Sequence, residues 1–470
     1  MSVNSQSAAV LYQDQNLSLI LVIAVISAAA AAGFVYAPLL VVAVLFVLPI
    51  LAAPLRFDLF VYAQVFLLPL CPFVNLPGLP IRNISMLLHF LLFAGVWIRR
   101  RQRGLPLYGW ILGSNVKKVI LLFVAVAVAS FFVSSAPRDA INSHSAIELL
   151  LSYVLTFFAV DGWLENRVQL ARVLKVLFLS TIGVALFGFY QAITGGYSEL
   201  YFALYPSKLD DYGIWEGRIT SLLFHFNSLA GYLNLIIPFG IACMVLARDR
   251  VLRFSGLICV SLAAIAVLLT QSRGGILATF GVFAVTCWLL VPRVATRIKI
   301  FSVSILCGLL LFPLILTHFE RLQGVDDATE FSRLALWQAA VGEFVGHPLL
   351  GVGYGNYKYF YSNFFFVPVE NLDRLDAHNL YLQLLAETGL IGFLVFAVIV
   401  ALFFRRSWNL IRDRDPLLRL TGVGVIGALA GTLIHGAVDF MFHVSPQFGA
   451  LFWIIMGLCT SAATIKPAAE

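Results

Sequence analysis

The sequence predicts an all-α membrane protein that crosses the bilayer many times. Of its 470 residues, 61% are hydrophobic and only 12% are charged, and the mean hydropathy is +0.93. That composition leaves too little polar surface for a water-soluble globule. The apolar residues also fall in runs long enough to cross a hydrocarbon core about 30 Å thick, and on that measure they predict about fourteen transmembrane helices.

The predicted spans follow one another with short connections. The run 17–53 is long enough for two helices hinged near Gly33, and the others fall at 58–74, 83–98, 118–135, 145–162, 174–193, 222–247, 255–271, 275–292, 300–317, 379–404, 420–441 and 446–462. Transmembrane helices one to eleven therefore occupy 1–317, and the last three occupy 379–470. The segment between them, 318–378, is large enough to form a separate region outside the bilayer.

The distribution of basic residues predicts the orientation of these spans. Cytoplasmic loops carry an excess of Lys and Arg. Placing both termini in the cytoplasm assigns most of the 31 Lys and Arg residues to inside loops and makes 318–378 a large periplasmic loop. The net charge of +7 is then mainly a topology signal, and it requires no nucleic-acid partner.

The periplasmic loop contains two local patterns. Residues 329–344 have helical periodicity and an acidic first turn, which predicts an amphipathic helix resting on membrane lipids. Gly351-Val-Gly-Tyr-Gly355 then ends the pattern. Because no strand precedes these glycines and no Lys-Ser/Thr pair follows them, a plain turn is favoured over a phosphate-binding loop.

The end of this loop and the start of the next span carry the most informative stretch. Asp376 is predicted as an N-cap, which puts His378 and Asn379 in a first turn that favours an anionic neighbour. Asn379, Gln383 and Glu387 are four residues apart and predict one polar stripe facing protein. His378 is the candidate acid–base group, since histidine titrates near neutral pH. A structural cap whose Gln and Glu bind neighbouring helices is the alternative.

Outward-facing arginines are the candidate anion-binding groups. Arg273 lies in Thr270-Gln-Ser-Arg-Gly-Gly275, between two spans with almost no loop, where an unpaired charge is costly. A guanidinium can hold two phosphate oxygens at once, although a snorkelling arginine is the alternative. Arg218 and Arg333 are weaker candidates. His225 and Asn227, at the start of the span 222–247, face the same side and are expected to line the same cavity.

Metal binding is not expected. The six cysteines lie in or beside apolar runs without a close-spaced pair, so they indicate neither a metal site nor a disulfide framework. His435, Asp439 and His443 are spaced by four on the predicted span 420–441, a pattern that can bind a metal. Their apolar neighbours favour structural hydrogen bonding instead. We expect no cofactor.

Together these motifs resemble the bacterial O-antigen ligase and O-antigen polymerase family over about 215–445. The resemblance rests on their order in the chain: Arg218 before His225-Phe-Asn227, Thr270-Gln-Ser-Arg-Gly-Gly275, Arg333-x-x-x-Trp337, His347-Pro-Leu-Leu-Gly-Val-Gly-Tyr-Gly-Asn356, and Asp376-Ala-His-Asn through Glu387-Thr-Gly-Leu-Ile-Gly392.

The resemblance implies a glycosyltransferase of the bacterial inner membrane whose active site faces the periplasm. Its donor would be a glycan on undecaprenyl diphosphate, and attack by the acceptor hydroxyl would invert the anomeric carbon without a metal. By the same resemblance, Arg273, Arg333 and Arg218 would hold the diphosphate and His378 would act as base. Asn379, Asp376, Gln383, Glu387, Asn227 and His225 would support them.

Several functions remain open at this stage. Within the family, ligation to lipid A core leads, polymerisation of O-antigen or exopolysaccharide follows closely, and transfer to protein is a third choice. A lipid-linked oligosaccharide flippase or other transporter is the rival class. Transporters tend to show internal repeats and charges at the bilayer midplane. The candidate groups here cluster at the outer surface instead, which favours the enzyme.

Overall fold

The structure is a computed structural model, and it describes residues 56–70, 84–134, 141–194, 217–223, 225–299, 302–303, 328–360 and 376–465. The chain divides into two compact units. The first, Met1–Leu67 with Gly196–Ile214, contributes one described helix, α3 (Phe57–Leu67). The second, Leu68–Gly195 with Trp215–Glu470, contains all the other described elements and every candidate site residue.

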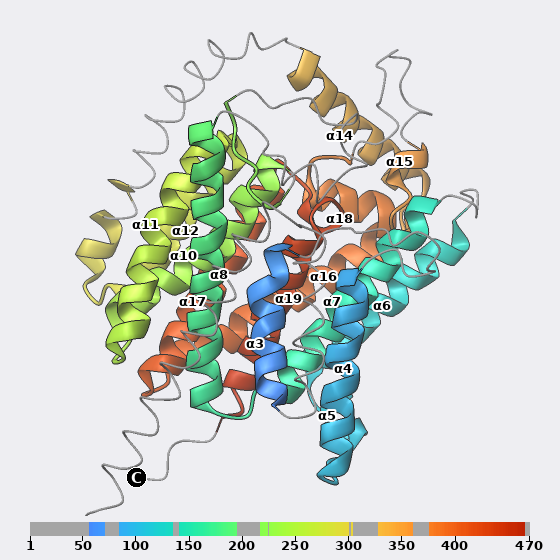
Figure 1. The fold of residues 1–470 in the computed structure, drawn as a ribbon. Coiled ribbons are helices and arrows are strands. Elements are labelled where there is room, and N and C mark those ends of the chain that lie inside the picture. The colour runs from blue at the N-terminus through green and yellow to red at the C-terminus, as the bar shows by residue number, and fades with distance from the viewer. Residues whose placement is uncertain are drawn as a thin grey trace, which may run out of the picture. The chain divides into compact units, whose positions relative to one another are not determined.

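The regular secondary structure in the described residues of the second unit is all helical, as predicted (Figure 1). Its elements are η1 (Leu68–Leu70), α4 (Ile84–Gln102), α5 (Leu107–Ile111), α6 (Asn115–Val133), α7 (Ile141–Trp163), α8 (Arg167–Thr194), α10 (Phe226–Leu246), α11 (Arg250–Thr270), α12 (Arg273–Leu290), α14 (Ala328–Gly346), α15 (Tyr357–Phe360), α16 (Leu380–Ile411), α17 (Pro416–Gly436), α18 (Met441–Val444) and α19 (Pro446–Ala462).

The protein is a multi-pass membrane protein. Among the described residues, eight helices are long and apolar enough to cross a bilayer: α6, α7, α8, α10, α11, α12, α16 and α17. The helices α3 and α19 are apolar but shorter. The spans predicted in 17–53 and most of 300–317 lie outside the described residues. The count of about fourteen, set by the bilayer thickness, and the cytoplasmic placement of both termini therefore stay predictions.

Helix α10 lies at the centre of the packing and contacts α11, α12 and α17. It is buried along most of its length, and small residues permit the close approach of its neighbours. A Cβ at Gly275 of α12 would lie 2.3 Å from the Cβ of Ala230. The buried Asn234 donates a hydrogen bond from Nδ2 to the Gly275 carbonyl oxygen at 2.9 Å. These contacts fix the first turn of α12, where Arg273 lies.

Helix α16 is broken near the end of its third turn. Gly389 has φ 62° and ψ −168°, which is outside the helical region and suits glycine. A Cβ at this position would lie 2.3 Å from the Leu349 carbonyl, so the chain needs glycine here for steric reasons as well. The break separates a short helix beginning at Leu380 from the long apolar segment that follows.

Residues 348–353 form hydrogen bonds with the backbone N–H and C=O groups that have no helical partner at the break. Four hydrogen bonds do this: Val352 N–H to Ala386 O at 2.8 Å, Gly353 N–H to Glu387 O at 3.0 Å, Leu390 N–H to Pro348 O at 2.8 Å and Ile391 N–H to Leu349 O at 3.3 Å. A break at membrane depth is tolerated only where such groups are paired. The glycines that predicted a plain turn do form one, with positive φ at Gly351, Gly353 and Gly355.

The helix predicted over 329–344 is confirmed as α14. Its inner face packs on α16 through Leu336, Ala339 and Ala340. Its outer face exposes apolar side chains, among them Val341 and Val345. In Figure 1, α14 and α15 lie at the same end of the second unit as α18. Contact of α14 with lipid stays a prediction.

The predicted span 420–441 is corrected by the structure. Helix α17 begins at Pro416 and ends at Gly436, where Leu380 packs so closely that an added Cβ would lie 2.9 Å from its side chain. Asp439 therefore follows the helix, and His443 belongs to the separate α18. The prediction that His435, Asp439 and His443 lie on one span is wrong, because the helix ends before the second of them.

Candidate functional site

The segment before α16 differs from the predicted cap. The N-cap is Asn379, whose Oδ1 accepts hydrogen bonds from the backbone N–H groups of Tyr381 at 3.0 Å and Leu382 at 3.1 Å. The prediction that Asp376 caps the helix, with His378 and Asn379 in its first turn, is wrong. Both residue types are good caps, and the one nearer the helix takes the position. His378 lies just outside the helix with φ 48°.

His378 is paired with a carboxylate from another element. Its Nδ1 lies 3.1 Å from Oδ1 of Asp439, and the two side chains are 24% and 7% exposed. Burial by itself lowers the pKa of His378, but the hydrogen bond and charge of Asp439 outweigh it and raise the pKa above its ordinary value. Burial raises the pKa of Asp439, but His378 and two further histidines lower it by more, so this carboxyl is ionised.

This pairing determines which nitrogen of His378 is available. When the ring carries its proton on Nδ1, it donates to Asp439 and leaves Nε2 as an acceptor. The same arrangement stabilises the imidazolium that forms once Nε2 has taken a proton. His378 is therefore oriented to act as a base.

Arg218 lies in an irregular segment, 217–223, that is bound to the junction of α11 and α12. Ile219 donates from its backbone N–H to the Leu269 carbonyl at 3.2 Å, and Gln271 donates from Nε2 to the Gly217 carbonyl at 3.0 Å. The Arg218 guanidinium lies over the ring of Phe226, with Cζ 4.4 Å from the centroid. The start of α10 and the end of α11 thus hold the segment together.

Arg273 is the first residue of α12, directly after a two-residue connection. Gln271, with φ 53°, ends α11, and Ser272 caps α12 by accepting from the Gly275 N–H at 3.1 Å. The Ser272 hydroxyl also donates to Oδ1 of Asn227 at 2.6 Å. Asn227 therefore helps fix the turn that presents Arg273. His225 is the N-cap of α10, accepting from the Asn227 N–H at 3.2 Å.

Arg273 and Arg333 both lie within electrostatic reach of Arg218, and Arg333 also lies within reach of His378. Burial lowers the pKa of Arg218 to about 10, and the charges of Arg273 and Arg333 contribute to that shift. The charge of Arg333, on α14, also acts on His378. Arg218, Arg273 and Arg333 are called the arginine cluster below. The structure thus brings together four side chains from four separate parts of the chain.

His435 lies against the same site, although it was expected to have a structural role on a longer span. Its ring is 3% exposed, and a Cβ at Gly274 would lie 3.0 Å from its Cδ2 atom. The charges of Asp439 and Arg333 both reach it. Because a side chain at position 274 would meet this ring, the glycine next to Arg273 allows α12 to begin beside His435.

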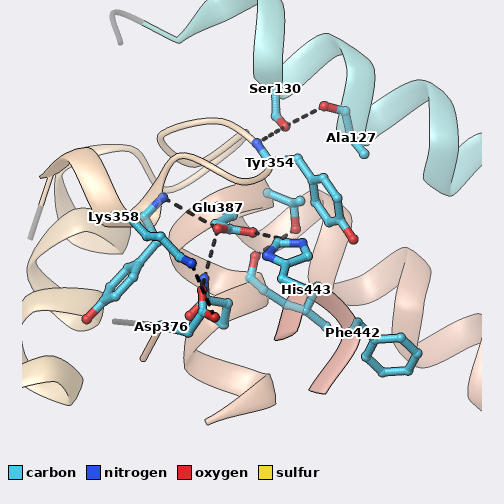
Figure 2. Close-up of polar contacts among 12 residues, drawn as sticks. Ala127, Ser130, Tyr354, Lys358, Asp376, Glu387, Phe442 and His443 are labelled. Atoms are coloured by element: carbon cyan, nitrogen blue, oxygen red, sulfur yellow. Dashed lines mark hydrogen bonds and ion pairs between the residues drawn. The ribbon is translucent and has the colours of Figure 1, made fainter. Parts of the chain in front are cut away.

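The predicted polar stripe on α16 faces protein, but it is a hydrogen-bond network rather than a ligand surface. Gln383 donates from Nε2 to Oε1 of Glu387 at 2.8 Å and to Oδ1 of Asp376 at 3.3 Å. Asp376 also pairs with Lys358 at 3.7 Å, and His443 lies 4.0 Å from Glu387 (Figure 2). Asn379 is outside this network, since it caps the helix.

The network ties the glycine turn to α16 and α6. Glu387 accepts from the backbone N–H groups of Gly355 and Tyr357, the latter at 3.4 Å. Figure 2 shows Tyr354 beside Ser130 of α6, whose Oγ accepts from the Tyr354 N–H at 3.1 Å. The amides of Val352, Gly353, Tyr354 and Gly355 are thus all bonded within the protein, and only that of Gly355 in this turn is bound by the carboxylate.

Sequence patterns missed several residues of the site. Asp439 was seen only as part of a helical repeat, because nothing local marks a partner that is distant in sequence. Nothing in the local sequence marks Lys358 as the partner of Asp376, or Glu343 as a buried carboxyl with 2% exposure. Within the described residues, no group of three or more His, Cys, Asp or Glu side chains is arranged to hold a metal ion.

The fold and the site define a class: a multi-pass membrane protein with a cationic cluster and a carboxylate-paired histidine at one end of its helices. Residues 258–397 match a family model described as O-Antigen ligase. This part of the chain is therefore similar to the O-antigen ligase family, in agreement with the resemblance that the motifs indicated. The matched range includes Arg273, Arg333 and His378.

Curated relatives extend this similarity. The chain is 22% identical over 377 residues to the teichuronic acid biosynthesis protein TuaE of Bacillus subtilis, covering 75% of this chain and 73% of the relative. It is 26% identical over 404 residues to the exopolysaccharide production protein ExoQ of Rhizobium meliloti, covering 77% and 81%. It is 28% identical over 154 residues to the O-antigen ligase of Pseudomonas aeruginosa, covering 33% of each chain.

Proposed function

We propose that the protein transfers a glycan from an undecaprenyl diphosphate carrier to an acceptor hydroxyl at the periplasmic face of the bacterial inner membrane. The observation that carries the proposal is the convergence of the arginine cluster with the pair of His378 and Asp439. Three guanidiniums suit an anion with more than one negative charge, and the adjacent imidazole suits deprotonation of a hydroxyl.

The residues divide the reaction between them. The acceptor oxygen forms a bond to the anomeric carbon while the bond from that carbon to the phosphate oxygen breaks, so the configuration inverts. Charge grows on the leaving diphosphate, and the arginine cluster is placed in advance to stabilise it, an effect worth several kcal/mol in a water-poor site. His378 takes the hydroxyl proton on Nε2, and Asp439 stabilises the imidazolium.

The share of this chain that aligns with each relative favours one acceptor. TuaE and ExoQ, which align with about three quarters of this chain, are named for teichuronic acid biosynthesis and exopolysaccharide production. The protein named O-antigen ligase aligns with one third. We therefore favour a growing polysaccharide as the acceptor, with lipid A core as the second choice.

A reconstituted assay tests the proposal. The purified protein in nanodiscs is supplied with an undecaprenyl-diphosphate-linked glycan, and lengthening of the glycan and release of undecaprenyl diphosphate are both measured. His378→Ala should abolish both, whereas His347→Ala, at an exposed histidine of the same loop, should leave them unchanged. Movement of the glycan across the bilayer without either product would instead identify a flippase.

A gene deletion separates the acceptors. Loss of an extracellular polysaccharide, with intact lipopolysaccharide, is expected for the favoured acceptor. Loss of all long chains from lipid A core would identify a ligase, and single-repeat caps would identify an O-antigen polymerase. An unglycosylated protein that is modified in the wild type would identify a protein acceptor.

A further inference from the structure

Strained backbone in the described residues is concentrated at the site. Three residues other than glycine have positive φ: Ser221 at 50°, Gln271 at 53° and His378 at 48°. Ser221 is three residues from Arg218, Gln271 is two from Arg273, and the third is the candidate base itself. Such a backbone conformation is strained for a residue with a side chain and persists only where its surroundings fix it.

A buried glutamine fixes the first of these segments. Gln191, near the end of α8, is 7% exposed. Its Oε1 accepts from the backbone N–H groups of Thr220 and Ser221, both at 2.9 Å, and its Nε2 donates to the Thr220 hydroxyl at 3.3 Å. The Ser221 hydroxyl donates in turn to the Val184 carbonyl of α8 at 2.7 Å. The side chain of Gln191 thus pairs two backbone N–H groups in the segment that carries Arg218.

A second buried glutamine fixes the segment of His378. Gln383 is 0% exposed, and its Oε1 accepts from the Ala377 N–H at 2.6 Å. Both hydrogens of its Nε2 are directed to carboxyl oxygens, those of Asp376 and Glu387. Its amide group therefore uses both of its donors and its acceptor, and only one orientation provides all of these bonds.

We propose that Gln191 and Gln383 are positioning residues: the first holds Arg218 for the diphosphate and the second holds His378 for the acceptor. This inference rests on the proposed glycan transfer. Neither glutamine touches the substrates in this scheme, so each acts only through the residue that it positions. Loss of Gln191 should then weaken donor binding, and loss of Gln383 should slow the chemical step.

Kinetics of two leucine variants test the proposal. Gln191→Leu should raise the donor KM about tenfold with a smaller change in kcat. Gln383→Leu should lower kcat about tenfold or more with little change in donor KM, because a displacement of about 1 Å in a reacting group costs up to 100-fold. Gln169→Leu is the matched control, since this glutamine is also buried on α8 but bonds to Glu165 at the other end of the helix.

Carboxylate variants keep the test decisive if a leucine variant fails to fold. Gln191→Glu still accepts from both backbone N–H groups, so its donor KM should stay within about threefold of the wild type. Gln383→Glu places a third carboxyl between Asp376 and Glu387 and removes the donors. Its activity relative to the wild type should therefore be low at pH 8 and rise as the pH falls and the new carboxyl gains a proton.

Binding of farnesyl diphosphate, measured by calorimetry in detergent, provides a result that does not depend on turnover. Gln191→Leu should weaken this binding and Gln383→Leu should leave it unchanged. If both leucine variants change KM and kcat alike, or if neither changes them, the positioning proposal is overturned. Absence of transfer by the wild type would instead overturn the proposed function, and the binding difference would still test the role of Gln191.

Discussion

Oδ1 of Asp439 lies 3.1 Å from Nδ1 of His378, although the two residues are 61 positions apart in sequence. The carboxylate follows the end of α17 and the imidazole precedes the start of α16, and these two helices pack against each other. The pair is therefore assembled by helix packing. It gives the imidazole a fixed orientation and a raised pKa in a site that also contains three arginines.

Replacing the partner carboxylate should change both the rate and its pH dependence. Because Asp439 raises the pKa of His378, Asp439→Asn should lower that pKa, and loss of the orienting carboxylate should reduce kcat by roughly 100-fold or more. The base must be neutral to act, so activity falls as the pH drops through its pKa. In the variant, the acidic limb of the profile of kcat/KM against pH should move to lower pH. An acidic limb at the wild-type position would contradict the pairing.

The arginine cluster should distinguish a diphosphate from a monophosphate. Arg273→Lys keeps the charge but loses the planar fork that holds two oxygens, so affinity for a prenyl diphosphate should fall about tenfold. Affinity for the corresponding monophosphate should fall less. Competition against the lipid-linked donor measures both, with Arg412→Lys at the far end of α16 as the control. Equal losses for the two ligands would argue against a diphosphate site.

The break in α16 should be sensitive to a single methyl group. Gly389→Ala forces a side chain into positive φ and against the Leu349 carbonyl, so it should destabilise the fold by about 2 kcal/mol or more. Gly346→Ala, where an added Cβ meets nothing within 4 Å, should have little effect. Thermal unfolding in detergent measures both variants. Equal melting temperatures of the two variants would contradict the requirement for glycine at the break in α16.

Glu343 should make the fold less stable in alkaline solution. Burial, with a further contribution from the charge of Glu387, raises the pKa of Glu343 to about 9. Because the pKa of Glu343 is higher in the folded protein than in the unfolded chain, its contribution to stability is fully present below the unfolded-state pKa. That contribution is lost as the pH rises through the folded-state pKa. Glu343→Gln should therefore melt a few degrees higher than the wild type at pH 8 and alike at pH 4. A lower melting temperature at pH 8 would contradict this account.

Local features of the site could be predicted from sequence because local chemistry determines them. The helix α14, the tight connection before Arg273 and the glycine turn all follow from periodicity and from residues with special backbone preferences. The choice of Asn379 over Asp376 as N-cap could not be predicted, since both side chains suit the position. In the structure, Asn379, the residue nearer the helix, is the cap, and Asp376 accepts a hydrogen bond from Gln383 instead.

Tertiary partners could not be predicted for a different reason. In a membrane protein most helix surfaces are apolar, so periodicity does not reveal which helices pack together. Helix α17 ends at Gly436, which packs against Leu380, and Asp439 lies beyond that end, where it pairs with His378. Gln191 is likewise informative only once α8 is seen beside the segment of Arg218.

The most direct test of the account is an electron cryomicroscopy structure of the protein in nanodiscs with a bound prenyl diphosphate. We predict density for the diphosphate among the guanidiniums of Arg218, Arg273 and Arg333, with the His378 ring beside it and Nδ1 directed to Asp439. Diphosphate density elsewhere on the protein, or arginine side chains too far apart to share one ligand, would contradict the central claim.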